Sequence, residues 1–318
     1  MFGDSARIIA KLAIAALLFA PGLPALAQQD PAAISLPGIT SYAPATEDGP
    51  LATAGGSEVT LAAQLTGEAG DVSRGLVWRI FRPEPGPDGK LPLVASAQGG
   101  TQVFSLAPGS YLVHATFGRA GATKRITVGA EAKREAVVLD AGGLKLDAIL
   151  SNGRRIPAAK LRFSIYEADG EDGGALIIPD VKPNAVVRLN SGTYHVVSTY
   201  GNVNAVIRSD IKVDAGKLTE ATVEHHAAEV TFKLVRESGG EAIADTSWSI
   251  VTDSGDPIRE SVGAYASLVL AEGNYTIIAK NRDRIYQREY TVEGGRDQEV
   301  EVLTTEAQVQ PVDGDIID

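Results

Sequence analysis

The feature of this chain that most constrains its fold is a string of residues that occurs three times. The copies read LAPGSYLVHATF, LNSGTYHVVSTY and LAEGNYTIIAKN, and their tyrosines are Tyr111, Tyr194 and Tyr275. These tyrosines lie 83 and 81 residues apart, and each follows a Gly by two positions and a Leu by five. Self-similarity at a fixed period indicates that one structural unit is repeated along the chain.

Three further sets of residues recur in the same order and at a similar period. Trp78, Phe163 and Trp248 are spaced 85 residues apart, and each is followed two residues later by Ile. The units begin with EVTLAAQL, LKLDAIL and EVTFKLV, and a late apolar segment of each ends in Val. Four anchors in one order predict three homologous units. We place them at residues 55–142, 143–227 and 228–305.

Each unit has the pattern of a small all-β domain. In the first unit, seven short segments such as LVWRIF and YLVHATF alternate apolar and polar residues or are rich in β-branched ones. Turn-forming sequences such as PGPDGK and APGS separate them. This pattern predicts an antiparallel β-sandwich in each unit, with Trp78, Ile80, Tyr111, Val113 and Ala115 pointing into the core of the first.

The linkers between units are short. We assign them to DAGG, from Asp140, and to EHHAA, from Glu224. Short linkers limit the swing of neighbouring domains, so we expect a semi-rigid, rod-like arrangement of the three sandwiches.

The repeated motif resembles known sandwich modules. Leu-x-x-Gly-x-Tyr at the start of a strand is similar to the tyrosine corner of immunoglobulin-like domains, in which the Tyr hydroxyl bonds to the backbone upstream. Its Pro-Gly-x-Tyr-x-Val form resembles bacterial carboxypeptidase regulatory-like (prealbumin-like) modules, and fibronectin type III domains more loosely. The resemblance implies three tandem Ig-like sandwiches with a non-catalytic accessory, spacer or binding role. The Lys–Asn bond of the related collagen-adhesin repeats is not expected, because the last strands contain no Asn.

The N-terminal residues have the pattern of a secretory signal peptide. Arg7 and Lys11 precede the apolar run LAIAALLFA, and Ala25-Leu26-Ala27 forms a small-x-small cleavage signal. An amphipathic core helix is the alternative. We expect cleavage after Ala27, a flexible linker over 28–54 and an acidic disordered tail over 306–318. These features predict a periplasmic or secreted protein with no transmembrane segment after signal cleavage.

Charge and cysteine content exclude several function classes. The chain has a net charge of −11, and loss of residues 1–27 would remove two cations and one anion. An acidic protein of this kind is a poor ligand for nucleic acid, which needs a basic surface. The absence of Cys excludes thiol nucleophiles, thiolate metal sites and disulfides.

No motif for catalysis or metal binding stands out. His225-His226, flanked by Glu224 and Glu229, is the strongest metal-like cluster, but adjacent strand residues point to opposite sides, and we interpret it as a solvated linker. The acidic loop 167–174 lacks the ligand spacing of a calcium loop, and no GxSxG motif is present. A triad or a carboxylate pair assembled from distant loops stays open. The sequence favours a protein that is not an enzyme and that binds no cofactor.

The hairpins that follow the repeated tyrosines carry positive charge in an otherwise acidic chain. Basic tips at one end of each sandwich would suit an acidic partner, whereas charge on an edge hairpin can instead prevent strand pairing. Both interpretations of the basic hairpins stay open. Tyr200 and Tyr286 lie near these hairpins in the sequence and are candidates for exposed contacts with a partner. The possible partner-binding residues are Arg119, Lys124, Arg125, Tyr200, Arg208, Arg282, Arg284, Tyr286 and Arg288.

These observations predict a non-catalytic structural or protein-interaction module, which acts as an envelope spacer or adaptor. A carbohydrate- or polyanion-binding module is the alternative, and an enzyme with an unrecognised site is the third possibility. The expected partner is an envelope protein or glycan and not a nucleic acid. The oligomeric state stays open.

Overall fold

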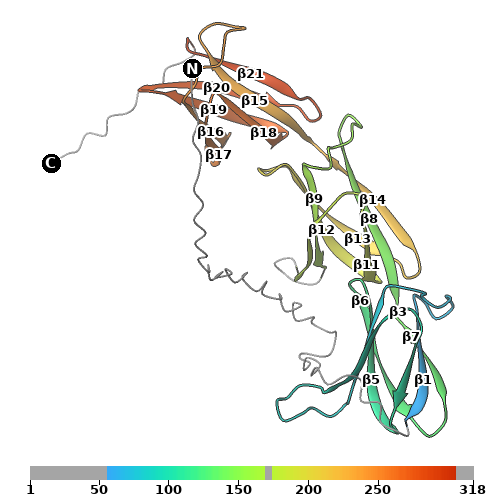
Figure 1. Ribbon diagram of the computed structural model, residues 1–318. Coiled ribbons are helices and arrows are strands. Elements are labelled where there is room, and N and C mark those ends of the chain that lie inside the picture. The colour runs from blue at the N-terminus through green and yellow to red at the C-terminus, as the bar shows by residue number, and fades with distance from the viewer. Residues whose placement is uncertain (1–55, 169–173, 306–318) are drawn as a thin grey trace, which may run out of the picture. The chain divides into compact units, whose positions relative to one another are not determined.

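The computed structural model describes residues 56–168 and 174–305, which form three β-sandwiches (Figure 1). The predicted signal peptide, the 28–54 linker, the acidic tail and most of the acidic loop 167–174 lie outside these residues. Within the two described ranges, no helix is long and apolar enough to cross a membrane.

Each sandwich contains seven strands, which confirms the number expected for the first unit. The first sandwich consists of β1 (Ser57–Gln64), β2 (Leu76–Phe81), β3 (Leu93–Gly99), β4 (Gln102–Leu106), β5 (Gly109–Phe117), β6 (Ala120–Val128) and β7 (Lys133–Val138). The second consists of β8 (Ala141–Leu150), β9 (Leu161–Glu167), β10 (Leu176–Val181), β11 (Val186–Asn190), β12 (Gly192–Tyr200), β13 (Val206–Val213) and β14 (Leu218–His225). The third consists of β15 (Ala227–Val235), β16 (Thr246–Thr252), β17 (Pro257–Val262), β18 (Tyr265–Ala271), β19 (Gly273–Asn281), β20 (Arg284–Val292) and β21 (Gln298–Leu303).

The sheet order is the same in all three sandwiches. The four-stranded sheets run β3-β2-β5-β6, β10-β9-β12-β13 and β17-β16-β19-β20, and the three-stranded sheets run β4-β1-β7, β11-β8-β14 and β18-β15-β21. Neighbouring strands are antiparallel, except that the first and last strands of each sandwich run parallel. The sequence repeat is therefore a repeat of topology. The tyrosine begins the fifth strand in this order, not the sixth as in immunoglobulin domains.

Alternation along the strands builds one hydrophobic core in each sandwich. Trp78, Phe163 and Trp248 occupy equivalent inward positions and are at most 1% exposed, which confirms the predicted core face. The indole N–H of Trp78 donates to the Gly100 carbonyl at 2.9 Å, and that of Trp248 donates to a carbonyl at 3.0 Å. Both Trp side chains therefore bury their apolar surface without leaving a polar group unpaired.

The three repeated tyrosines form the predicted corner. The hydroxyls of Tyr111, Tyr194 and Tyr275 each donate to the carbonyl oxygen four residues upstream, at 2.8, 2.8 and 2.7 Å. Each bond fixes the turn that leads into the fifth strand of its sandwich. The repeated motif is thus an architectural element.

Tyr194→Phe is expected to lower the free energy of unfolding of the second sandwich by about 0.5–1.5 kcal/mol, and by up to about 3 kcal/mol if the Asn190 carbonyl stays unpaired. Hydrogen exchange followed by mass spectrometry measures the change in β12. Tyr166→Phe is the matched control, because the Tyr166 hydroxyl forms no hydrogen bond with the described residues. Equal losses in the two variants would contradict a role for the corner bond.

Candidate functional site

The predicted partner-binding cations fall into two groups. One group is exposed and consists of Arg119, Arg125, Arg208, Arg282 and Arg284. Lys124 and Arg288 instead tie the sixth strand of their own sandwich to its seventh. The Lys124 ammonium lies 2.7 Å from the Glu135 carboxylate, and the Arg288 guanidinium donates to the Glu301 carbonyl. These two cations therefore have structural partners.

Tyr200 and Tyr286 are buried, so the prediction that they make exposed contacts is wrong. They are 2% and 4% exposed. Tyr200 belongs to the core of the second sandwich, where its ring lies edge-on to the His225 ring. Tyr286 belongs to the core of the third. Each tyrosine lies near the hairpin end of its strand and continues the alternation of inward-pointing side chains. The sequence alone does not show that the core extends as far as the hairpin.

The hairpin between β5 and β6 contacts the second sandwich. The Arg119 N–H donates to the Arg188 carbonyl at 3.0 Å, and the Gly121 N–H donates to the Asn190 amide oxygen at 3.1 Å. The Arg188 guanidinium stacks on the Phe117 ring, with 4.3 Å between the guanidinium carbon and the ring centroid. We call this set of contacts the first joint.

The hairpin between β12 and β13 contacts the third sandwich in the same way. The Asn204 side chain donates to the Tyr275 hydroxyl at 2.9 Å and accepts the Ala271 N–H at 3.0 Å. Val203 packs against the core of the third sandwich, and Val269 packs in the core of the second. This second joint therefore combines apolar contact with hydrogen bonds to the tyrosine corner.

The two joints use equivalent positions in the repeat. Gly118 and Gly201 each lie seven residues after the tyrosine of their own sandwich, with φ of +68° and +75°. A Cβ atom at Gly118 would lie 3.0 Å from the Cβ of Arg188, and one at Gly201 would lie 2.7 Å from the Cβ of Val269. Arg188 and Val269 each precede the next tyrosine by six residues. Glycine permits both the left-handed backbone and the close approach.

The linkers are shorter than predicted. β7 ends at Val138 and β8 begins at Ala141, while only His226 separates β14 from β15. The Asp140 carbonyl accepts the Ser191 N–H at 2.7 Å. The His226 carbonyl accepts the N–H of the equivalent residue, Glu272, at 2.9 Å. The residues that looked like linkers extend the first and last strands. Glu224 and His225 continue the parallel pairing of β14 with β8, whereas Ala141 and Ala227 begin the antiparallel pairing of β8 with β11 and of β15 with β18.

The interpretation of His225 as a solvated linker residue is also wrong. His225 is 1% exposed, and its Nε2 lies 2.8 Å from the Ser198 hydroxyl oxygen. Burial lowers the pKa of His225 to about 4. No carboxylate of the described residues bonds to this imidazole, and Ser198 is equally buried. The pair lacks the access and the third group that a hydrolytic triad needs.

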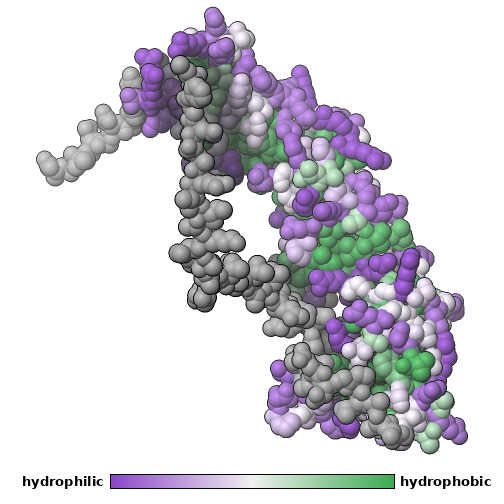
Figure 2. Space-filling view, in the orientation of Figure 1, coloured by the Kyte–Doolittle hydropathy of each residue, from purple (hydrophilic) through white to green (hydrophobic). Residues whose placement is uncertain are grey.

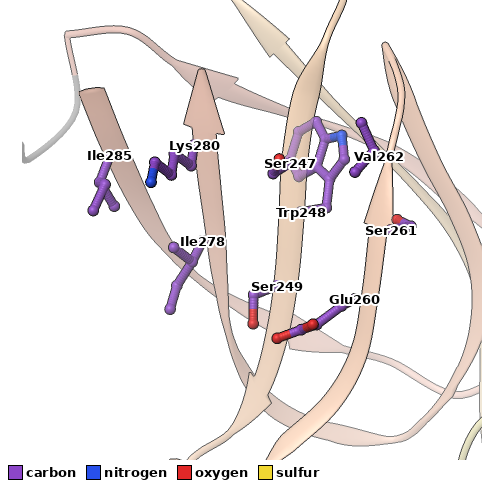
Figure 3. Close-up of a pocket in the computed structure, with 9 residues that line it drawn as sticks. All are labelled: Ser247, Trp248, Ser249, Glu260, Ser261, Val262, Ile278, Lys280 and Ile285. Carbon is purple, nitrogen blue, oxygen red and sulfur yellow. The ribbon is translucent and has the colours of Figure 1, made fainter. Parts of the chain in front are cut away.

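A groove of about 470 Å³ crosses the outer face of the four-stranded sheet in the third sandwich (Figure 3). Ser247 and Ser249 on β16 lie at its centre. Val262, which is 76% exposed, flanks Ser247 on β17, and Lys280 flanks it on β19. Figure 3 shows Ser249 and Glu260 pointing into the same space. The lining residues are Ser247, Trp248, Ser249, Glu260, Ser261, Val262, Ile278, Lys280 and Ile285.

The groove combines the apolar side chains of Val262, Ile278 and Ile285 with the charged side chains of Glu260 and Lys280. On the face drawn in Figure 2, hydrophilic residues predominate and hydrophobic residues gather in smaller areas. Neither Lys280 nor Glu260 forms an ion pair with another described residue, although both line the groove. Within the described ranges, no group of three His, Asp or Glu side chains is placed to hold a metal ion. The groove is thus suited to weak polar and apolar contact.

One family model matches part of the chain. Residues 229–304 match the Rhizobiales growth-associated tandem repeat domain, a range that begins in β15 and ends just after β21. The comparison with curated proteins found no match.

Several solved structures resemble the chain. The Bacillus anthracis TIE protein is 14% identical with a TM-score of 0.24, and the match covers 78% of this chain and 50% of that one, so the chain spans about half of its length. The minor pilin GBS52 of Streptococcus agalactiae is 12% identical with a TM-score of 0.30, covering 53% and 95%. A streptococcal ancillary pilin is 12% identical with a TM-score of 0.30, covering 78% and 98%. At such values the likeness carries no argument about function.

Proposed function

We propose that this chain is a non-catalytic structural module, a spacer or adaptor that acts outside the cytoplasm. The observation that carries the proposal is the pair of joints, in which each hairpin bonds to the tyrosine corner of the next sandwich. Neighbouring domains joined only by a linker are expected to move freely. Direct bonds at both joints restrict such movement, as a spacer of fixed reach requires.

Two further features support this proposal. The match of residues 229–304 to a growth-associated tandem repeat domain supports a role that depends on the repeats themselves. The predicted signal peptide, with cleavage after Ala27, supports export to the periplasm or beyond. The resemblance of the tyrosine motif to carboxypeptidase regulatory-like modules agrees with an accessory role.

The partner would contact the third sandwich or the exposed hairpin cations. The groove on the outer face of β16 and β19 provides apolar surface beside Lys280 and Glu260, which form no ion pair with the residues that the structure describes. Arg282 and Arg284 are both exposed on one hairpin of an acidic protein, which favours an envelope polyanion as the second candidate ligand.

In-cell photo-crosslinking tests the proposal. A photoreactive amino acid at Ser249 probes the groove, and one at Arg284 probes the hairpin. Thr127, which is exposed on the first sandwich, is the matched control site. We expect mass spectrometry to find one stoichiometric envelope protein linked from Ser249 or Arg284 but not from Thr127. Adducts to polysaccharide alone would favour the second candidate, and turnover of a substrate by the purified chain would overturn the proposal.

A further inference from the structure

The third hairpin, between β19 and β20, differs at its tip from the two hairpins that form the joints. Arg282 lies seven residues after Tyr275, the position that Gly118 and Gly201 occupy in the other two hairpins. Its φ is +54°, so the backbone keeps the left-handed conformation of the two glycines. A side chain in this conformation is strained, because its Cβ crowds the backbone. The third hairpin therefore shows that the turn itself tolerates a side chain, and that close approach to a neighbour is what demands glycine.

The first tyrosine corner, at Tyr111, differs from the two corners that receive a hairpin at the joints. Pro108 lies three residues before Tyr111, where the second and third sandwiches have Ser191 and Glu272. The N–H groups of Ser191 and Glu272 donate to the linker carbonyl that enters their sandwich. Proline has no N–H, so the first corner lacks this donor.

We propose that each joint is a selective interface that accepts only a glycine-tipped hairpin, and that Arg282 excludes the third hairpin from it. The excluded partner is a second copy of this chain. A contact between the third hairpin of one copy and the first corner of another would be heterologous and would join copies head to tail into a ring or a filament. Arg282 blocks the close approach on one side of that contact, and Pro108 removes a donor on the other. This inference does not depend on the proposed envelope role.

The absence of native Cys makes distance measurements between sandwiches direct, because introduced cysteines are the only labelling sites. Spin labels at Thr222→Cys and Arg259→Cys report on the second joint. Labels at Thr127→Cys and Thr222→Cys report on the first. All three residues are exposed. Double electron–electron resonance gives the distance distribution for each pair.

Gly201→Arg places the tip residue of the third hairpin in the second. We expect the distribution across the second joint to broaden at least about twofold, because the domains are no longer held together. The distribution across the first joint stays unchanged. Circular dichroism and hydrogen exchange confirm that the second sandwich is still folded. A distribution across the second joint as narrow as that of the unmodified chain would overturn the proposal.

Gly239→Arg is the matched control. Gly239 also has a positive φ, of +78°, but nothing lies within 4 Å of the position of its Cβ. We expect no broadening in this variant. Equal broadening in both variants would show that backbone strain, and not docking, produces the effect, and would also overturn the proposal.

A second measurement tests the exclusion of another copy. A photoreactive amino acid replaces Asp283, at the exposed tip beside Arg282, in the otherwise unmodified chain at high concentration. We expect no crosslink between this site and residues 106–110 of another molecule. Such a crosslink would overturn the proposal, whereas it would leave the envelope role standing.

Discussion

Replacing Trp248 with alanine is expected to lower the free energy of unfolding of the third sandwich by about 3–5 kcal/mol. The side chain is 1% exposed and packs beside Phe232, with ring centroids 6.4 Å apart. Its loss leaves a cavity in the core and removes the indole bond to the Gly263 carbonyl. A small domain has a total stability of about 5–15 kcal/mol, so the third sandwich should unfold well before the others.

Calorimetry and hydrogen exchange measure this change. Trp78 is then the sole tryptophan, and its fluorescence follows the first sandwich alone. Trp78→Ala is the reciprocal variant, which should destabilise the first sandwich and leave Trp248 to report on the third. A loss below about 1 kcal/mol in β16 and β19 would contradict the assignment of Trp248 to the core.

Acid is expected to destabilise the second sandwich through His225. Burial lowers its pKa from the ordinary 6.5 to about 4, so the folded imidazole stays neutral while that of the unfolded chain becomes protonated. Between these values the unfolded state binds more protons, and stability therefore falls as the pH drops. The contribution of His225 is fully present above pH 6.5. About 3 kcal/mol of it is lost by pH 4.

The variant His225→Gln separates this effect from the titration of carboxylates. Denaturant unfolding of the second sandwich, followed by hydrogen exchange at pH 7 and pH 4.5, should show a weaker pH dependence than in the unmodified chain. His226→Gln is the matched control, because the neighbouring His226 side chain is 59% exposed. An unchanged pH dependence in His225→Gln would show that this histidine does not titrate with unfolding. His114 of the first sandwich, also buried with a pKa of about 4, is expected to act likewise there.

Local pattern explains which predictions the structure confirms. The alternation around Trp78 and Tyr111 predicts their inward positions, because a strand presents successive side chains to opposite faces. The same rule fails to show where a core ends. Tyr200 lies at a strand terminus and beside a turn, which is typical of an exposed residue, yet a neighbouring sandwich follows directly. His225 likewise lies at the end of a strand, β14, and is buried.

The sequence by itself determined the three units, their strands, their tryptophan core positions and the tyrosine corners, because each depends on residues close together within one repeat. Only the tertiary structure decided what the hairpins do. Gly118 and Arg188 are 70 residues apart, and Asn204 and Tyr275 are 71 apart, and the two residues of each pair belong to different sandwiches. Their contact depends on how two folded sandwiches approach each other. That approach is set by steric fit and hydrogen bonds between surfaces, which strand periodicity does not encode.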